Sequence, residues 1–199
     1  MSIRTVQTSP AVSTPAVTAT NPLPAGGGHQ CRPTRARRTV TGCTGVPNSP
    51  TGGRRLVLVD IENVVGGSRA TADQVRTGLD LVDAQVARRD SDVWVVACGK
   101  DLLRTAMAVL PNNVRVGHGV DGADLELVAY LDPSAVVGHF ESVVIVSGDG
   151  RAFTGAVAAL RSLDVPTDVV ARPGTIGHGL YCTARSFTPL AMPAFALAA

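Results

Sequence analysis

Three aspartates stand at positions where a parallel sheet could gather them, and together they could hold a metal ion. Asp60 directly follows Leu56-Val57-Leu58-Val59, Asp149 follows the apolar run 143–146, and Asp124 lies in the first turn of a predicted helix. A single aspartate after a strand or in a first helical turn usually caps the helix or complements its dipole. Asp60 fits that explanation less well, because an acid beside four buried aliphatic residues costs stability unless a site uses it.

These carboxylates meet only if the fold brings their elements together. In an open parallel sheet, ligands bind outside the carboxyl ends of the strands, where the strand order reverses. If the strands before Asp60 and Asp149 are neighbours there, the carboxylates repel one another unless a cation lies between them. Mg²⁺ or Mn²⁺ prefers carboxylate oxygens and is commonly shared with substrate phosphates. The sequence therefore predicts a Mg²⁺ or Mn²⁺ site with Asp60, Asp124 and Asp149 as ligands.

The elements that must position these acids alternate along residues 54–190. Short apolar runs predict five strands, at 56–60, 93–98, 114–116, 143–146 and 168–171. Thr71 and Gln74 have the spacing of a capping box, and Pro133 is expected to end the helix before the fourth strand. Five strands alternating with four helices predict right-handed crossovers and a doubly wound, parallel α/β sheet. A closing helix is expected over 180–190.

Charge is divided unevenly along the 199 residues, although the net charge is only +2. All 16 acidic residues lie at or after Asp60, where 11 basic residues leave that part of the chain at −5. Residues 1–53 carry arginines without acids and are rich in Ser, Thr, Pro, Ala and Gly. We expect them to form a disordered basic tail that touches polyanions, or else a solvated tail with incidental arginines. Residues 191–199 are expected to be a C-terminal tail.

Several other classes of protein lack their signatures here. The four cysteines form no C-x-x-C pair, which argues against a zinc framework, and the glycines match no nucleotide-binding loop. No apolar run reaches the roughly 18 residues of a membrane helix, so we expect a cytoplasmic protein without a membrane partner. His118 and His178 have no second ligand at metal-binding spacing and are interpreted as loop histidines.

Three segments, in this order, resemble the NYN domain, a branch of the PIN-like nucleases. They are Leu-Val-Leu-Val-Asp-Ile-Glu-Asn at 56–63, Gly-Ala-Asp-Leu-Glu-Leu at 122–127 and Val-Ile-Val-Ser-Gly-Asp at 144–149. The resemblance spans about 56–190. It implies a PIN-like sheet of strand order 3-2-1-4-5 and a metal-dependent ribonuclease acting on RNA.

The resemblance also implies roles for single residues. Asp60, Asp124 and Asp149 would be both the catalytic residues and the metal ligands. Asn63 would support the site and, with Ser147, is a candidate for substrate binding. Arg151 lies near where the family commonly places a further acid. It could bind the scissile phosphate or be a solvated arginine at a helix start, and Asp121 or Glu126 could replace the missing acid.

Three hypotheses follow. The first is an endoribonuclease in which Mg²⁺ or Mn²⁺ activates a water and stabilises charge on a phosphodiester. The second is a degenerate PIN-like domain that binds RNA or a protein partner without cutting. The third is a scaffold whose acids only cap helices. The sequence does not determine whether the substrate is RNA or DNA, whether the site holds one metal ion or two, or whether the chain forms a homodimer.

We predict that deleting residues 1–53 leaves the fold intact and weakens nucleic-acid binding, most strongly at low salt. The reason is that the arginines of this segment would act mainly by releasing counterions from the phosphates. Fluorescence anisotropy with labelled RNA at two salt concentrations measures the effect. Equal affinity of the full and shortened chains at low salt would contradict the prediction.

Overall fold

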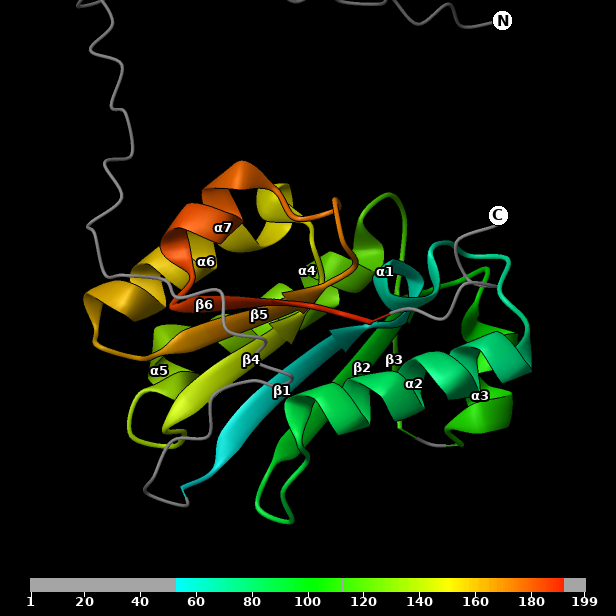
Figure 1. The fold of residues 1–199 in the computed structure, drawn as a ribbon, viewed down its shortest axis with the longest axis horizontal. Coiled ribbons are helices and arrows are strands. Elements are labelled where there is room, and N and C mark those ends of the chain that lie inside the picture. The colour runs from blue at the N-terminus through cyan, green and yellow to red at the C-terminus, as the bar shows by residue number, and fades with distance from the viewer. Residues whose placement is uncertain (1–52, 112, 192–199) are drawn as a thin grey trace, which may run out of the picture. The chain divides into compact units, whose positions relative to one another are not determined.

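The computed structural model describes residues 53–111 and 113–191, so the two predicted tails lie outside the described residues except for Gly53 and Ala191. The described residues contain one parallel sheet of order β3-β2-β1-β4-β5-β6 (Figure 1). Its strands are β1 (Arg55–Asp60), β2 (Val93–Gly99), β3 (Val114–Gly117), β4 (Ser142–Val146), β5 (Thr167–Ala171) and β6 (Ser186–Pro189). The prediction of a parallel α/β sheet is confirmed.

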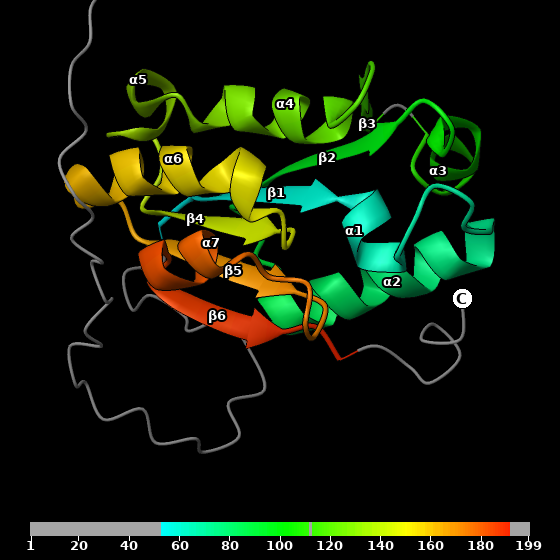
Figure 2. The same ribbon diagram turned by 90° about the horizontal axis from the view of Figure 1, so that it is seen from above.

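Helices cover both faces of this sheet (Figure 2). They are α1 (Ile61–Val65), α2 (Ala72–Val86), α3 (Leu103–Val109), α4 (Gly122–Val128), α5 (Pro133–Val136), α6 (Gly150–Ser162) and α7 (His178–Thr183), with a 3₁₀ turn at Ala129–Leu131. In the described part of the chain, no helix is both long enough and apolar enough to cross a bilayer.

The central strand β1 divides the apolar core into two layers. Successive side chains of a strand point to opposite faces, and here every residue of β1 is buried. Leu56 and Leu58 pack in the cluster formed by α4, α6 and α7, whereas Val57 and Val59 pack in the cluster formed by α2 and α3. A strand buried on both faces needs the continuous apolar run seen here. Asp60, the last residue of β1, therefore lies where the two apolar layers end.

The sheet has six strands, so the prediction of five was wrong. Residues 180–190 do not form one closing helix: α7 ends at Thr183, and β6 pairs with β5 through Phe187 and Val169. The buried Asp168 accounts for the change, because its carboxylate accepts hydrogen bonds from the Arg185 guanidinium and the Ser186 hydroxyl. A buried carboxylate needs such partners, and they hold this segment in an extended conformation along β5.

Two short helical elements add detail to the predicted pattern. Helical backbone ends at Leu131, two residues before Pro133 as predicted, and Pro133 then begins α5, where its missing amide hydrogen costs nothing. Asp132 caps α5 by accepting from the Ser134 amide. The short helix α1 was not predicted. It begins directly after Asp60, whose side chain is its N-terminal cap.

A buried arginine ties the start of the sheet to the end of α2. The Arg55 guanidinium donates to both carboxylate oxygens of Asp92, at 2.8 and 2.6 Å. It also donates to the carbonyl oxygens of Val86 and Ala87, which end α2. Burial of the Asp92 carboxyl opposes ionisation, but the hydrogen bonds from Arg55 and from the Arg89 amide outweigh it and lower its pKa. The pair therefore stabilises the fold above pH 3.8, and this contribution is lost as pH falls through the lowered pKa.

We predict that Arg55→Ala lowers the free energy of unfolding at pH 7 by about 3–5 kcal/mol, because it removes the cation that pairs with the buried Asp92 carboxylate and the donor to two carbonyl oxygens, leaving Asp92 the Arg89 amide. Urea unfolding measures the change. The matched control is Arg76→Ala, which removes an exposed pair with Asp73 and should cost less than about 1 kcal/mol. Equal losses in the two variants would mean that Arg55 does not hold these elements together.

Candidate metal centre

Asp60 lies at the carboxyl end of β1, and α1 begins at the next residue. One of its carboxylate oxygens accepts from the backbone amides of Glu62, at 3.0 Å, and Asn63, at 3.3 Å. The residue is only 5% exposed. Burial raises the pKa of Asp60 to about 6, opposed by the Asn63 and Glu62 amide hydrogen bonds and assisted by the charges of Glu62 and Asp149. Asp60 is therefore a helix cap within electrostatic reach of the other acids.

The loop after β4 places Asp149 at the same edge of the sheet. Asp149 caps α6 by accepting from the amides of Arg151, at 2.7 Å, and Ala152, at 3.3 Å. The Ser147 hydroxyl oxygen accepts from the Asp149 amide, and the Asn63 side-chain oxygen accepts from the amide that follows Ser147. Asn63 therefore links α1 to the loop after β4. Ser147 is 1% exposed, so its hydrogen bond to Asp149 positions the loop, while its direct contact with substrate stays a prediction.

The turn between β3 and α4 brings in Asp124 and a second acid, Asp121. A side chain at Gly117 would place its Cβ 1.9 Å from the backbone of Gly122, so only glycine allows this close approach. Asp121 occupies the N-cap position in the left-handed conformation, with φ of 56°, and its side chain makes no capping hydrogen bond. Aspartate tolerates this conformation better than most residues. Its carboxylate is left available to neighbours other than its own helix.

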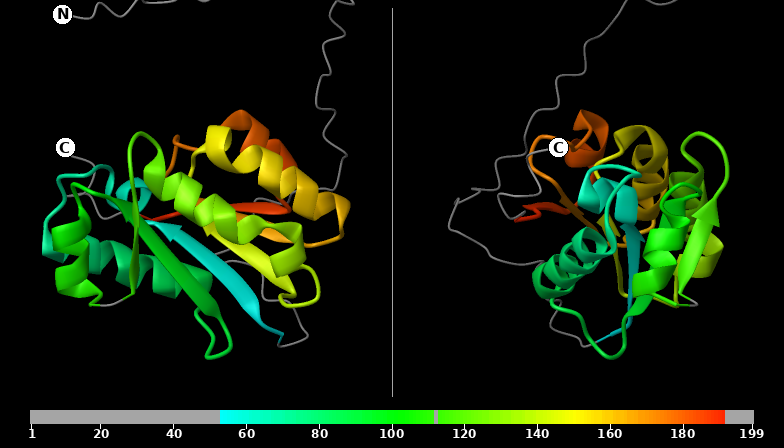
Figure 3. Two further views of the ribbon diagram at one scale, coloured as in Figure 1. Left: turned by 180° about the vertical axis from the view of Figure 1, so that it is seen from behind. Right: turned by 90° about the vertical axis from the view of Figure 1, so that its right-hand side faces the viewer.

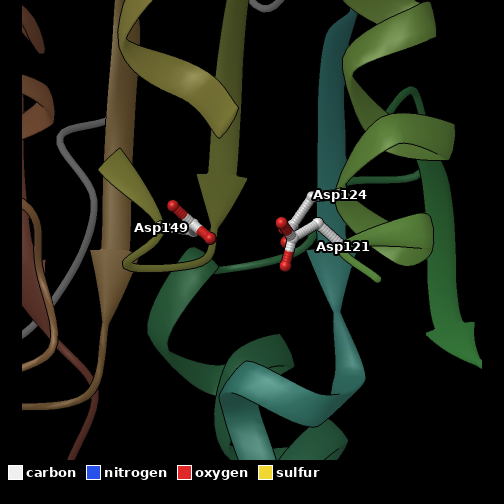
Figure 4. A group of neighbouring side chains, drawn as sticks. All are labelled: Asp121, Asp124 and Asp149. Atoms are coloured by element: carbon white, nitrogen blue, oxygen red, sulfur yellow. The ribbon is translucent and has the colours of Figure 1, made fainter. Parts of the chain in front are cut away.

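Asp121, Asp124 and Asp149 form one group in which one carboxylate oxygen from each residue lies within 4.8 Å of the others. Figure 4 shows the side chains of Asp121 and Asp124 together at the start of α4, with Asp149 facing them from the loop after β4. Asp60 is not a member of this group. The structure thus brings together two of the three predicted ligands and adds Asp121, which the sequence offered as a replacement acid. The other such candidate, Glu126, is exposed on α4.

Asp124 is the acid that most needs a partner. It is 8% exposed, and its Oδ1 atom has no hydrogen-bond partner among the described residues. Burial, together with the charges of Asp60, Asp149 and Asp121, raises the pKa of Asp124 to about 7. A buried oxygen without a donor, facing two more carboxylates, suits a hard divalent cation that takes oxygen ligands. The residues present therefore fit Mg²⁺ or Mn²⁺.

Arg151 and His178 lie next to this group. Arg151 is exposed in the first turn of α6, and His178 is the first residue of α7 rather than a loop residue. The sequence was interpreted as giving His178 no second ligand, but the Cys182 sulfur, four residues along α7, lies 3.6 Å from the His178 Nε2 atom. Only the contact between the β4–α6 and β5–α7 loops places it near Asp149.

Comparisons with known proteins add little to this geometry. No family model and no curated protein matches the chain. Among solved structures, a protein of unknown function from Vibrio parahaemolyticus is similar, with 15% sequence identity and a TM-score of 0.47 over 73% of this chain and 97% of that chain.

We predict that, in EDTA, Asp124→Asn stabilises the protein increasingly as pH rises from about 4 to about 8. The folded wild-type protein holds a proton on Asp124 more tightly than the unfolded chain does, since its pKa is about 7 instead of 3.8. The free energy of unfolding of the wild type therefore falls as pH rises over that range. This contribution is absent in the variant, because an amide has no proton to lose. The gain at pH 8 should be on the order of 2–4 kcal/mol by urea unfolding. The control is the exposed acid Asp80, and a difference that does not vary with pH would contradict the assignment.

Proposed function

We propose that the chain is a ribonuclease of the NYN type that uses Mg²⁺ or Mn²⁺ to hydrolyse RNA phosphodiester bonds. One observation carries the proposal: the buried carboxylate of Asp124 has an oxygen without a partner and faces the carboxylates of Asp121 and Asp149. This group lies at the carboxyl edge of a parallel sheet, which is where such folds bind ligands. The NYN-like segments of the sequence supply Asp124 and Asp149 of this group, as well as the neighbouring Asp60.

The residues would share the work as follows. Asp121, Asp124 and Asp149 would hold the cation, and Asp60 would add negative charge behind them. When bound, the metal would stabilise charge on the phosphodiester and lower the pKa of a water molecule. Asn63 and Ser147 keep the Asp149 loop in place through their hydrogen bonds. We expect such an enzyme to act on RNA in the cytoplasm.

Two observations support a second function, which is binding without cleavage. Asp60 and Asp149 both accept hydrogen bonds from helix amides, so each has a structural role without a metal ion. Arg151 also occupies the region where the NYN family commonly has another acid. A domain that binds RNA or a protein partner without cleavage would show both features. In the nuclease the Asp149 charge would bind the cation, whereas in the domain that does not cleave RNA the Asp149 side chain would only cap α6.

We predict that Asp149→Asn leaves the fold intact but removes the response to metal. Asparagine still caps a helix through its side-chain oxygen, so little stability should be lost, whereas a ligand charge is lost completely. In thermal and urea unfolding, Mn²⁺ at 100 times its dissociation constant should stabilise the wild type by about 2.7 kcal/mol and the variant far less. Mn²⁺-dependent cleavage of a mixed RNA pool should nearly disappear.

Asp132→Asn is the matched control, because Asp132 caps α5 in the same way and lies outside the acid group. It should retain both the Mn²⁺ stabilisation and the cleavage. If Asp149→Asn responds to Mn²⁺ like the wild type, the three-acid site is wrong. If Mn²⁺ stabilises the wild type but RNA is not cut, the binding class is favoured over the nuclease.

A further inference from the structure

A pocket of about 650 Å³ lies beside the acid group and shares Asp149 with it. Its wall includes Asn63, Arg151 and His178, together with glycines from two loops. The volume falls within the range of about 300–1,000 Å³ that is typical of ligand sites. We call it the flanking pocket.

Backbone contacts fix the shape of the flanking pocket. The loops after β4 and β5 touch each other, and the Gly177 amide donates to the Gly148 carbonyl oxygen at 2.8 Å. A Cβ at Gly177 would lie 2.7 Å from the Gly150 Cα, and one at Gly148 would lie 2.6 Å from the Thr175 carbonyl oxygen. The helices that follow these loops, α6 and α7, pack side by side (Figure 2). The two loops therefore approach each other more closely than side chains at these glycines would allow, and this contact sets the wall of the pocket.

The donors that face the flanking pocket suit an anion. The hydroxyls of Thr154 and Thr175 already donate to backbone carbonyl oxygens. Arg151 is exposed two residues from Asp149, yet within the described ranges its guanidinium forms no salt bridge. His178 is exposed, and its Nε2 atom lies 3.6 Å from the Cys182 sulfur. Arg151, His178 and the side-chain NH2 group of Asn63 are thus the side-chain groups on this wall that can donate to a ligand, and Arg151 is the one with a permanent positive charge.

The neighbouring acids restrict what that anion can be. A free anion would be repelled by Asp149 and by the carboxylates grouped with it. A strand of nucleic acid avoids this cost, because one of its phosphates can share the cation at the acid group while the next occupies the flanking pocket. No Phe, Tyr or Trp lines the pocket, so it offers no aromatic platform for base stacking. Contacts to phosphate position a strand without reading its sequence.

We propose that the flanking pocket binds a backbone phosphate of a single-stranded RNA substrate, through Arg151 and His178, adjacent to the phosphate held at the acid group. This inference rests on the proposed function. It assigns Arg151 to substrate binding beside the scissile phosphate and gives His178 a role as second donor. Recognition at this position is independent of base identity.

The test measures RNA affinity without cleavage. The full chain and its variants are titrated with a labelled oligouridine of about ten nucleotides at several KCl concentrations, in EDTA and again in Ca²⁺. Arg151→Gln should weaken binding several-fold and reduce the slope of log K against log salt by about 0.7, the value for one contact to a single-stranded phosphate. His178→Ala should weaken binding by a smaller factor. Melting temperatures show that each variant is folded.

Arg104→Gln is the matched control. Arg104 is an exposed arginine of α3, which packs against the other face of the sheet, so its loss should leave the slope unchanged. The arginines of residues 1–53 are present in every variant and cancel in the comparison. An Arg151→Gln slope equal to that of Arg104→Gln overturns the proposal.

A second measurement locates the contact on the strand. A single uncharged methylphosphonate linkage is moved along the oligouridine, and the wild type should lose affinity at the position that meets the flanking pocket. Arg151→Gln should show no further loss there. If both proteins lose affinity equally at every position, Arg151 contacts no single phosphate and the proposal fails.

These results separate the inference from the proposed function. Normal RNA binding by Arg151→Gln, with intact stabilisation by Mn²⁺, would overturn the flanking pocket alone. The absence of any metal response, with the Arg151 effect retained in EDTA, would overturn the metal-dependent nuclease and leave the phosphate contact standing.

Discussion

The reversal of strand order at β1 is the constraint on which the rest of the domain depends. β1 pairs with β2 on one side and with β4 on the other, so the chain crosses the sheet in opposite directions from it. Val59 pairs with Val146, which puts the start of α1 and the loop after β4 at the same height. The Asn63 side chain of α1 accepts a hydrogen bond from that loop. Because all six strands are parallel, every loop that carries a candidate residue opens at this edge.

The acidic side chains at that edge differ in the hydrogen bonds that stabilise them. Asp60 and Asp149 each accept two backbone amides, which compensates part of the cost of burying them. Asp124 has no such compensation at one oxygen, and Asp121 makes no capping bond. This edge of the sheet therefore combines two helix caps with two acids whose interactions within the described residues are incomplete. These two acids distinguish the edge from one whose acids only cap helices.

Sequence patterns predicted the features that depend on neighbours along the chain. The apolar run before Asp60 predicted a doubly buried strand, and Thr71 with Gln74 forms the expected capping box at the start of α2. The order of the first five strands, implied by the NYN resemblance, is also that of the structure. Asp124 and Asp149 lie in one group because α4 packs over β1 and β2 and contacts α6, which follows Asp149.

Features that depend on distant contacts could not be predicted in this way. β6 needs Asp168, 17 residues before Arg185, and no local period reports that bond. The place of Asp121 depends on the contact between Gly117 and Gly122, and that of His178 on glycines from two loops. In each case the role of the residue depends on a second segment, distant in the sequence, that the fold places beside it.

The two ends of the sheet restrict how copies of this domain can meet. β3 and β6 are its edge strands, each four residues long, and they lie on opposite sides of the domain (Figure 3). β6 ends in Pro189, which has no amide hydrogen, and β3 carries the exposed charge of Arg115. Short edges with a proline or a charge are poor templates for another strand. The sheet is therefore protected against growth by strand addition, and any pairing of copies is expected to use helical surfaces.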